Sequence, residues 1–382
     1  MRVYFDNAAT TPLAPEVIEA MLPFMQTHFG NPSAIHSFGR ETRSAIEKAR
    51  KTIAKHLNCS PGEIFFTSGG TESSNFAIRR GVEASGAKHI ITSPIEHHCV
   101  LHTVEELEKS GKIKAHYVKV DSRGRFDLNH LEELLKILEA PVFVSLMHAN
   151  NEIGTMMDID AVAEICNRYN AVLHTDTVQS MCHHRFDLQK TKVSMLQGSG
   201  HKFHGPKGVG FIYISSLIKL HPLLFGGGQE RNMRAGTENL YGIIGLAKAM
   251  DFAYEHFDEN KSKIESLRKY FIVQLKENFS GVTFNGDYDG RYLFTVLNVA
   301  FPHNDKSELL LFNLDVAGIA ASSGSACSSG SDVGSHVLNA IGVGTDKVCI
   351  RFSFSDYNTI AEVDYAISKL KELMPQAVTV TE

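Results

Sequence analysis

The sequence of 382 residues has no tryptophan and no feature of a secreted or membrane protein. Its six cysteines are scattered, without a Cys-x-x-Cys pair or the density of a disulfide scaffold, so we expect most of them to be buried thiols. No apolar run approaches the roughly 20 residues that cross a bilayer, and the first residues lack the apolar core of a signal peptide. We therefore expect a cytoplasmic protein that does not bind a membrane.

Neither sign of charge is in large excess. Lysine and arginine total 38, aspartate and glutamate total 43, and the net charge is -5. This balance gives no electrostatic reason to expect a nucleic acid as partner, so we expect a small molecule or a protein. The apolar share of 43% fits a globular protein, and the length suggests two domains or one large one.

Short apolar runs alternate with amphipathic segments through much of the chain. Helical spacing appears at 15–28, 39–57, 128–139 and 159–170, and apolar runs lie at 64–68, 89–93, 115–120, 142–149, 171–176 and 209–214. This alternation predicts an α/β fold with βα units around a mostly parallel sheet, in which ligands collect at the carboxyl ends of the strands.

The pattern changes near residue 261, where a long helical segment is followed by strands and shorter helices. This change predicts a smaller α+β domain. We expect a large domain over residues 15–256 and a small domain formed by residues 1–14 and 257–382.

Polar and glycine residues follow two of the expected strands. The segment TSGGTE (67–72), with Gly70 and Thr71, follows one strand and opens a helix, where free amides and the helix dipole favour a phosphate, although a Gly-Gly pair is more often a simple turn. Asp176 ends another strand, where its carboxylate could keep a pyridine nitrogen protonated while Gln179 reaches a ring hydroxyl. The alternative is that Asp176 only caps the next segment.

Two further segments carry nucleophiles. Lys202 lies among small residues, where neighbouring groups could make it a reactive amine, and Ser199 and His201 could bind phosphate oxygens beside it. Lys207 is interpreted as a solvated surface charge.

The segment 320–331 has nothing that would pack a core, so we expect a mobile, exposed loop whose reactive side chain is Cys327. Four other cysteines, which lie in helical or strand patterns, are expected to be buried and inert: Cys59, Cys99, Cys166 and Cys349.

Several of these segments together resemble a known family. The segments SGHK (199–202) and HGPKG (204–208), the opening YFDNAATTP (4–12) and the segment NNEIG (150–154) are similar to those of cysteine desulfurases of the NifS/IscS branch. These enzymes belong to the class V aminotransferase-like group on fold type I of pyridoxal phosphate (PLP) enzymes. The segment SGSAC (323–327) is similar to the long active-site loop of that branch.

The resemblance implies PLP as cofactor and gives roles to residues in this sequence. Lys202 would form the Schiff base, His97 would stack on the ring, and Asp176 and Gln179 would contact its nitrogen and hydroxyl. Cys327 would take sulfur from L-cysteine as a persulfide, leaving L-alanine. The phosphate would be held by Gly70, Thr71, Ser199 and His201, together with Thr237 from a second subunit of a homodimer.

The resemblance also implies that Asn151 and Arg351 bind the substrate carboxylate. The persulfide would then pass to an acceptor protein, as in iron–sulfur cluster assembly.

Some residues depart from the family pattern. Asp332, Val333 and Gly334 stand where a Leu-Glu-Pro-like turn is usual, which leaves the sulfur acceptor open. The cluster at 182–184 (Cys-His-His) could bind a metal or a second persulfide, but we predict no metal site. The rival interpretations are a selenocysteine lyase, a conventional aminotransferase and a non-catalytic scaffold of a sulfur-transfer complex.

Overall fold

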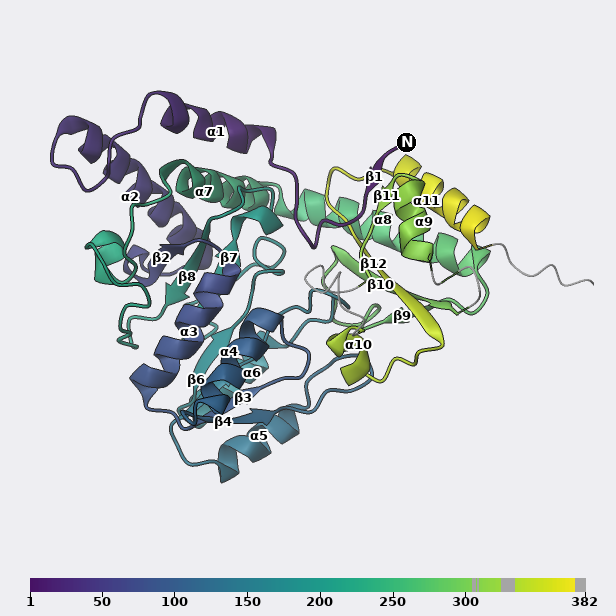
Figure 1. The fold of residues 1–382 in the computed structure, drawn as a ribbon, viewed down its shortest axis with the longest axis horizontal. Coiled ribbons are helices and arrows are strands. Elements are labelled where there is room, and N and C mark those ends of the chain that lie inside the picture. Colours follow the sequence, from purple (N-terminus) through teal and green to yellow (C-terminus); the bar gives the residue numbers. More distant parts are fainter. Residues whose placement is uncertain (304–306, 308, 324–333, 375–382) are drawn as a thin grey trace, which may run out of the picture.

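A seven-stranded sheet occupies the centre of the larger part of the chain (Figure 1). The computed structural model describes residues 1–303, 307, 309–323 and 334–374. The strand order is β2-β8-β7-β6-β5-β3-β4, and only β8 runs antiparallel to its neighbours. The strands are β2 (Ile64–Thr67), β3 (His89–Thr92), β4 (Lys114–Tyr117), β5 (Val142–Ser145), β6 (Val172–Thr175), β7 (Met195–Ser199) and β8 (Gly210–Ile214).

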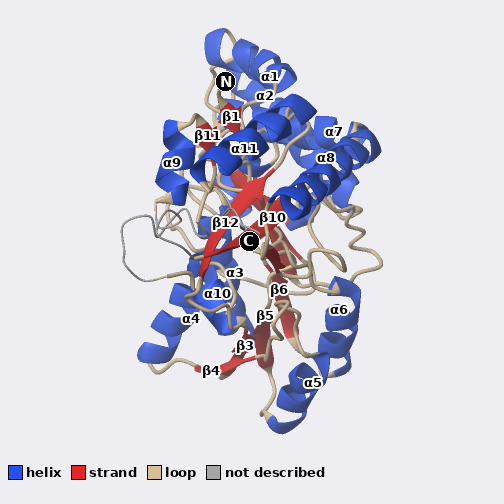
Figure 2. Ribbon diagram, turned by 90° about the vertical axis from the view of Figure 1, so that its right-hand side faces the viewer, coloured by secondary structure: helices blue, strands red, loops and turns tan. Residues whose placement is uncertain are grey.

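Helices cover both faces of this sheet, as Figure 2 shows. Alternate residues of a strand point to opposite faces, so Phe65 of β2 joins the core under α3 and α4, while Phe66 joins the core under the remaining helices. The helices are α1 (Pro15–Gln26), α2 (Ser37–Leu57), α3 (Gly70–Ser85), α4 (His98–Lys109), α5 (Leu128–Ile137), α6 (Ile159–Arg168) and α7 (Leu240–Glu255). Short 3-10 helices are η1 (Pro61–Glu63), η2 (Gly200–Lys202) and η3 (Gln229–Asn232).

A second, smaller core lies around an antiparallel sheet of order β12-β10-β9. The strands of this part are β9 (Thr283–Asn285), β10 (Val296–Pro302) and β12 (Lys347–Ser353), with β1 (Val3–Tyr4) pairing in parallel with β11 (Ile319–Ala320). Its helices are α8 (Phe257–Asn278), α9 (Leu310–Val316), α10 (His336–Ala340) and α11 (Ile360–Leu373). The chain therefore forms an α/β fold with a mostly parallel central sheet and a smaller α+β part.

The N-terminal arm, residues 3–14, runs from the small core to the large one (Figure 1). Phe5 is fully buried in the small core, where its ring packs against Phe271, Phe352 and Phe354. Ala14, at the start of α1, belongs to the core of the large sheet. Only His256 separates α7 from α8, and the domain boundary at residues 256 and 257 stays a prediction.

Three local expectations were wrong. The strand expected over 142–149 ends at Ser145, because the backbone N–H of Met147 donates to the Glu96 carboxylate, 2.9 Å away. Strand β7 was not expected, since its sequence MLQGS ends in small and polar residues. The loop expected from residue 320 begins later, because Ala320 belongs to β11 and Ser322 forms a backbone bridge with Arg351.

In the parts of the chain that the structure describes, no helix combines the length and apolar character needed to cross a bilayer.

Candidate functional site

A cavity of about 240 Å³ opens where the parallel strands end. All strands of the sheet except β8 run in the same direction, so the loops that follow them lie at one edge, and those after β2, β3, β5, β6 and β7 line the cavity. The cavity brings together ten of the residues singled out in the sequence: Gly70, Thr71, His97, Asn151, Asp176, Gln179, Ser199, His201, Lys202 and Arg351.

One end of the cavity is formed by the start of α3. Gly69 has φ of 148°, and a Cβ on Gly70 would lie 2.7 Å from Val178 Cγ2, so a side chain there would collide with the cavity wall. Ser199 faces the same turn, since a Cβ on Gly69 would lie 3.5 Å from its Oγ. Backbone amides at the start of a 16-residue helix, with a hydroxyl beside them, suit a phosphate.

The cavity is also lined by a buried carboxylate. Asp176 follows β6 and is 6% exposed, and its Oδ1 accepts the backbone N–H of Val178 at 2.9 Å. Burial raises the pKa of Asp176, while His174 and Lys202 oppose that rise. Asp176 therefore also caps the following segment, as the alternative interpretation expected, and its buried carboxylate lies where a cationic group would stabilise it.

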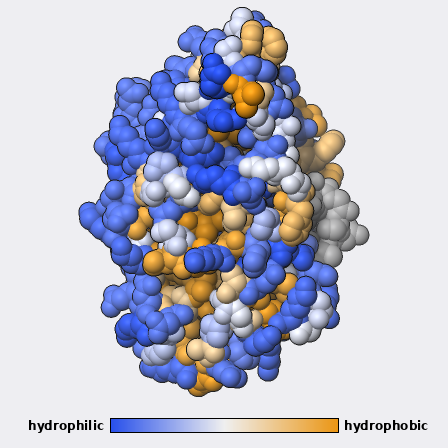
Figure 3. All heavy atoms as spheres, turned by 90° about the vertical axis from the view of Figure 1, so that its left-hand side faces the viewer, coloured by the Kyte–Doolittle hydropathy of each residue, from blue (hydrophilic) through white to orange (hydrophobic). Residues whose placement is uncertain are grey.

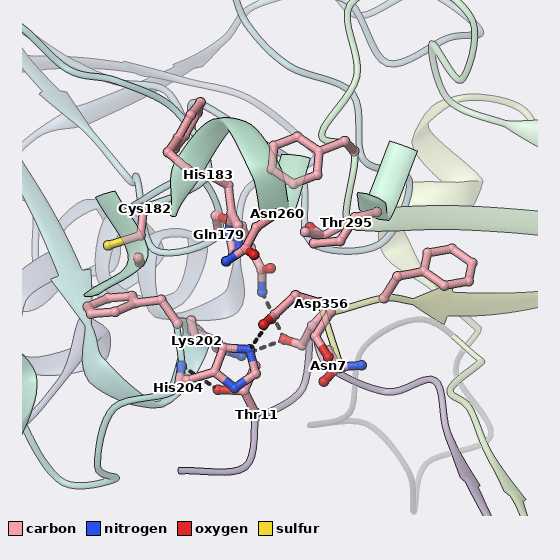
Figure 4. Close-up of a pocket in the computed structure, with 18 residues that line it drawn as sticks. Asn7, Thr11, Gln179, Cys182, His183, Lys202, His204, Asn260, Thr295 and Asp356 are labelled. Atoms are coloured by element: carbon pink, nitrogen blue, oxygen red, sulfur yellow. Dashed lines mark hydrogen bonds and ion pairs between the residues drawn. The ribbon is translucent and has the colours of Figure 1, made fainter. Parts of the chain in front are cut away.

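Lys202 lies in η2 and lines the same cavity. Its Nζ donates to the carbonyl oxygens of Ala8 at 2.7 Å and Ala9 at 2.8 Å, and Gln179 Nε2 donates to the same Ala8 oxygen at 2.9 Å. Lys202 and Gln179 also line a second cavity of about 40 Å³, which Figure 4 shows. The N-terminal arm therefore fixes the amine, a contact that local sequence patterns did not reveal.

His97 is the residue before α4, and its ring lies at the cavity wall. Its Nδ1 accepts the backbone N–H of Cys99 at 3.1 Å, which places the ring proton on Nε2. Burial, followed by the charge of Lys202, lowers the pKa of His97 to about 4. The ring is therefore neutral near pH 7.

Arg351 approaches the cavity from β12 of the small core and is 1% exposed. Its Nη2 donates to Asp6 Oδ1 at 2.7 Å and its Nη1 to the Asn151 carbonyl at 2.9 Å. Ser322 donates to the same Asp6 oxygen at 2.8 Å. The Nε of Arg351 is buried without a hydrogen-bond partner, and such an orphaned donor suits a ligand carboxylate.

Two of the predicted site residues are not among those that line this cavity. Thr237 is exposed and lines a separate cavity of about 200 Å³ together with Ser68 and Arg234. Cys327 lies outside the described residues, which stop at Ser323 and resume at Gly334.

The cysteines differ from expectation, since Cys59, Cys99 and Cys349 are half-buried and only Cys166 of the four is buried. Cys99 was assigned to the inert core, yet it lines the cavity, although burial and the charge of Asp176 raise its pKa and keep it a thiol. The helical period of its surroundings gave no signal that it faces a ligand. Cys182 is buried, and the described residues hold no group of three His, Cys, Asp or Glu side chains that could bind a metal, so the metal alternative at 182–184 has no support there.

Comparison with known proteins decides the family. The class V aminotransferase family (Aminotransferase class-V) matches residues 3–366. The chain belongs to this family. A cysteine desulfurase IscS of Dictyoglomus turgidum is 44% identical over 384 residues, covering 99% of this chain and 96% of the relative. A putative cysteine desulfurase IscS 1 of Bacillus subtilis is 44% identical over 380 residues, covering 98% of each chain.

Solved structures agree with this assignment. A NifS-like protein with 40% identity superposes with a TM-score of 0.89, covering 98% of this chain and 99% of that chain. The structure of SspA in complex with cysteine has 33% identity and a TM-score of 0.80, covering 94% and 100%. The predicted family and fold are confirmed, and the chain is a PLP enzyme of fold type I in the cysteine desulfurase group.

The residues of the cavity fit this cofactor. A side chain on Gly70 would collide with Val178, so the glycine leaves the start of α3 open to a phosphate, and the buried carboxylate of Asp176 calls for a cation such as a protonated ring nitrogen. Lys202 supplies an amine in the same cavity.

Proposed function

We propose that the protein removes sulfur from L-cysteine, leaving L-alanine, and transfers it through Cys327 to an acceptor protein. The observation that carries this proposal is the single cavity in which Lys202, Asp176 and Arg351 meet, in a chain of the cysteine desulfurase group. An amine, a buried carboxylate and a guanidinium are the groups needed to bind the cofactor and an amino acid together.

Bound PLP would serve as an electron sink for the bonds around the substrate Cα. Gly70, Thr71, Ser199 and His201 would hold its phosphate, His97 would stack on the ring, and Gln179 would contact the ring hydroxyl. Asp176 would keep the positive charge at the ring nitrogen, and its burial would make that pairing strong. Lys202 moves the proton at the substrate Cα, as an amine placed within reach of it.

The substrate carboxylate binds Arg351 and Asn151. The planar fork of Arg351 matches a carboxylate, and its Nε is the buried donor that has no partner. Asp6 and the Asn151 carbonyl hold the two terminal nitrogens of the guanidinium, so its orientation is set before the substrate arrives. Asp6 thus partly neutralises the charge that attracts the substrate, without occupying Nε.

Sulfur transfer balances without any external oxidant. The Cys327 thiolate attacks the substrate sulfur, so the S–S bond of the persulfide forms as the C–S bond of the substrate breaks. The electron pair of the C–S bond stays with the substrate carbon, which gains a proton and yields alanine. The sulfur then leaves Cys327 as the acceptor protein takes it.

Purified protein supplied with PLP and then with cysteine tests the function. We expect a visible absorbance band from the bound cofactor, alanine in the solution, and one extra sulfur on Cys327 by peptide mass spectrometry. A protein that stays colourless with PLP, or forms no alanine, contradicts the proposal.

The Arg351→Lys variant should raise the KM for cysteine about 10- to 100-fold with a smaller change in kcat, because lysine keeps the charge but loses the fork. Steady-state rates against cysteine concentration give both constants. Arg268→Lys is a matched control, since Arg268 is also buried (2% exposed) but its nitrogens donate to the carbonyls of Val296 and Tyr288. An unchanged KM in Arg351→Lys would remove Arg351 from substrate binding.

We also propose a homodimer in which Thr237 of one chain completes the phosphate site of the other. Thr237 is exposed and lies outside its own chain's cofactor cavity. Apolar side chains are exposed on α1, the loop after it and the start of α2, and Figure 3 shows apolar patches on that side of the molecule. They include Ile18, Leu22, Met25, Phe29, Ile35 and Phe38.

Apolar patches of this kind are typical of a protein interface. Sedimentation equilibrium should give twice the mass of the 42.2 kDa chain, and a single-chain mass would contradict the dimer.

A further inference from the structure

A chain of buried polar side chains lies behind the cofactor cavity and ends at Cys99. Ser145 Oγ lies 2.8 Å from His174 Nδ1, and His174 Nε2 lies 2.8 Å from Gln197 Oε1. Gln197 Nε2 donates to Ser74 Oγ at 2.8 Å, and Ser74 Oγ lies 3.4 Å from Cys99 Sγ. Ser145, His174, Gln197 and Ser74 are 0% exposed.

The chain of contacts has a direction. The Gln197 amide donates through Nε2 to Ser74, so its oxygen accepts from His174 and the imidazole proton lies on Nε2. Burial lowers the pKa of His174, which leaves its Nδ1 as the acceptor for the Ser145 hydroxyl. Hydrogen-bond donation therefore runs from Ser145 towards Ser74.

Cys99 stands at the cavity end of this chain, between two cofactor-binding groups. Its Sγ lies 3.0 Å from His97 Nδ1 and 4.0 Å from Asp176 Oδ2. The other titratable groups around Asp176 are Lys202, His174 and Glu96. Among the described contacts, the Cys99 sulfur is thus the one side-chain atom that contacts both the His97 ring and the Asp176 carboxylate.

We propose that Cys99 is a positioning residue: its thiol, presented by the chain from Ser145 to Ser74, holds His97 and the Asp176 carboxylate in the orientations that the cofactor ring requires. The inference rests on the proposed function and specifies how its ring-binding groups are held. Networks of this kind restrict each member to one geometry, because a buried polar group that loses its partner is destabilised. An inert core cysteine has no need of a polar chain behind it.

Two replacements of Cys99 separate positioning from space filling. In Cys99→Ala the dissociation constant for PLP, measured by absorbance after equilibrium dialysis of the resolved protein, should rise about 3- to 10-fold, the loss expected for one hydrogen bond. The pH midpoint of the bound cofactor's absorbance should move by about 0.5 unit or more, the shift that matches a 3-fold change. In Cys99→Ser, which keeps a hydrogen-bond donor, the dissociation constant for PLP should stay within about 2-fold of that of the unmodified protein.

Ser74→Ala tests the chain behind the thiol. We expect it to move the pH midpoint in the same direction as Cys99→Ala but by less, because Ser74 acts through Cys99. The double variant Cys99→Ala with Ser74→Ala should match Cys99→Ala alone, since contacting residues of one network are not additive. Cys166→Ala, which truncates a buried thiol of α6 remote from the cavity, is the control and should leave the midpoint unchanged.

The inference fails if Cys99→Ala keeps the pH midpoint and the PLP affinity of the unmodified protein. It also fails if Cys99→Ser and Cys99→Ala change these two quantities equally. Additive effects of Ser74→Ala and Cys99→Ala would likewise contradict the role of the hydrogen-bonded side chains from Ser145 to Ser74. Any of these results leaves the proposed function intact, provided that alanine is still formed from cysteine. Loss of alanine formation in the unmodified protein, in contrast, would reject the function itself.

Discussion

Replacing Lys202 with alanine is expected to reduce alanine formation from cysteine by about 10⁴-fold or more, the upper range for loss of a positioned acid–base group. Among the described residues that line the cavity, Lys202 alone carries an amine. No neighbouring side chain can therefore take over the covalent bond to the cofactor and the proton transfer that are proposed for it. The measurement is the rate of alanine release under saturating PLP.

A second readout separates chemistry from misfolding. After borohydride reduction and denaturation, the unmodified protein should retain the cofactor covalently, and Lys202→Ala should lose it. Lys202→Arg keeps a cation that can reach the carbonyls of Ala8 and Ala9, but arginine does not lose its proton near neutral pH, so it should be equally inactive.

Lys207→Ala serves as the matched control. Lys207 lies in the same loop and is exposed, as the sequence indicated. We expect unchanged activity and unchanged cofactor retention. Covalent retention of PLP by Lys202→Ala would show that another amine carries the bond.

Replacing Cys327 with serine is expected to abolish the protein-bound persulfide and to slow alanine formation by about 10³-fold or more, as loss of a catalytic nucleophile does. A hydroxyl is a far weaker nucleophile than a thiolate at neutral pH, while binding of PLP and cysteine does not need the thiol. The variant should therefore keep its visible absorbance and still respond spectrally to cysteine.

Cys59→Ser provides the comparison for this variant. Burial raises the pKa of Cys59 to about 12, so its thiolate is scarce at neutral pH and its removal should change neither alanine formation nor the persulfide yield. If Cys327→Ser still accumulates one persulfide per chain while Cys59→Ser does not, Cys327 is not the cysteine that carries the persulfide.

The parts of the fold and site that follow strand ends could be predicted from the sequence. Apolar runs located most strands of the large sheet, and their polar ends located Asp176 and the glycine turn at Gly70. The reason is physical: parallel strands share one carboxyl edge, so polar residues that follow them converge. The resemblance then supplied His97, Asn151 and Arg351, which no local pattern marks.

The missed features depend on contacts between distant segments. Asp6 and Arg351 lie 345 positions apart in the sequence, and Ala8 is held to Lys202 across 194 positions. Cys99 lies in a helix with ordinary periodicity, so its exposure to the cavity follows only from how α4 packs against α3. Tertiary packing, rather than any local propensity, determines these contacts.

The N-terminal arm has a consequence for the timing of assembly during synthesis. Residues 3–11 are synthesised before the segments that they bind, since Val3 pairs with Ile319, Asp6 with Arg351 and Thr11 with His201. The Lys202 amine can be anchored once residue 202 has emerged, whereas the guanidinium becomes available only when residue 351 has been added. Nascent chains should therefore be able to capture the coenzyme before they acquire the ability to recognise an amino acid.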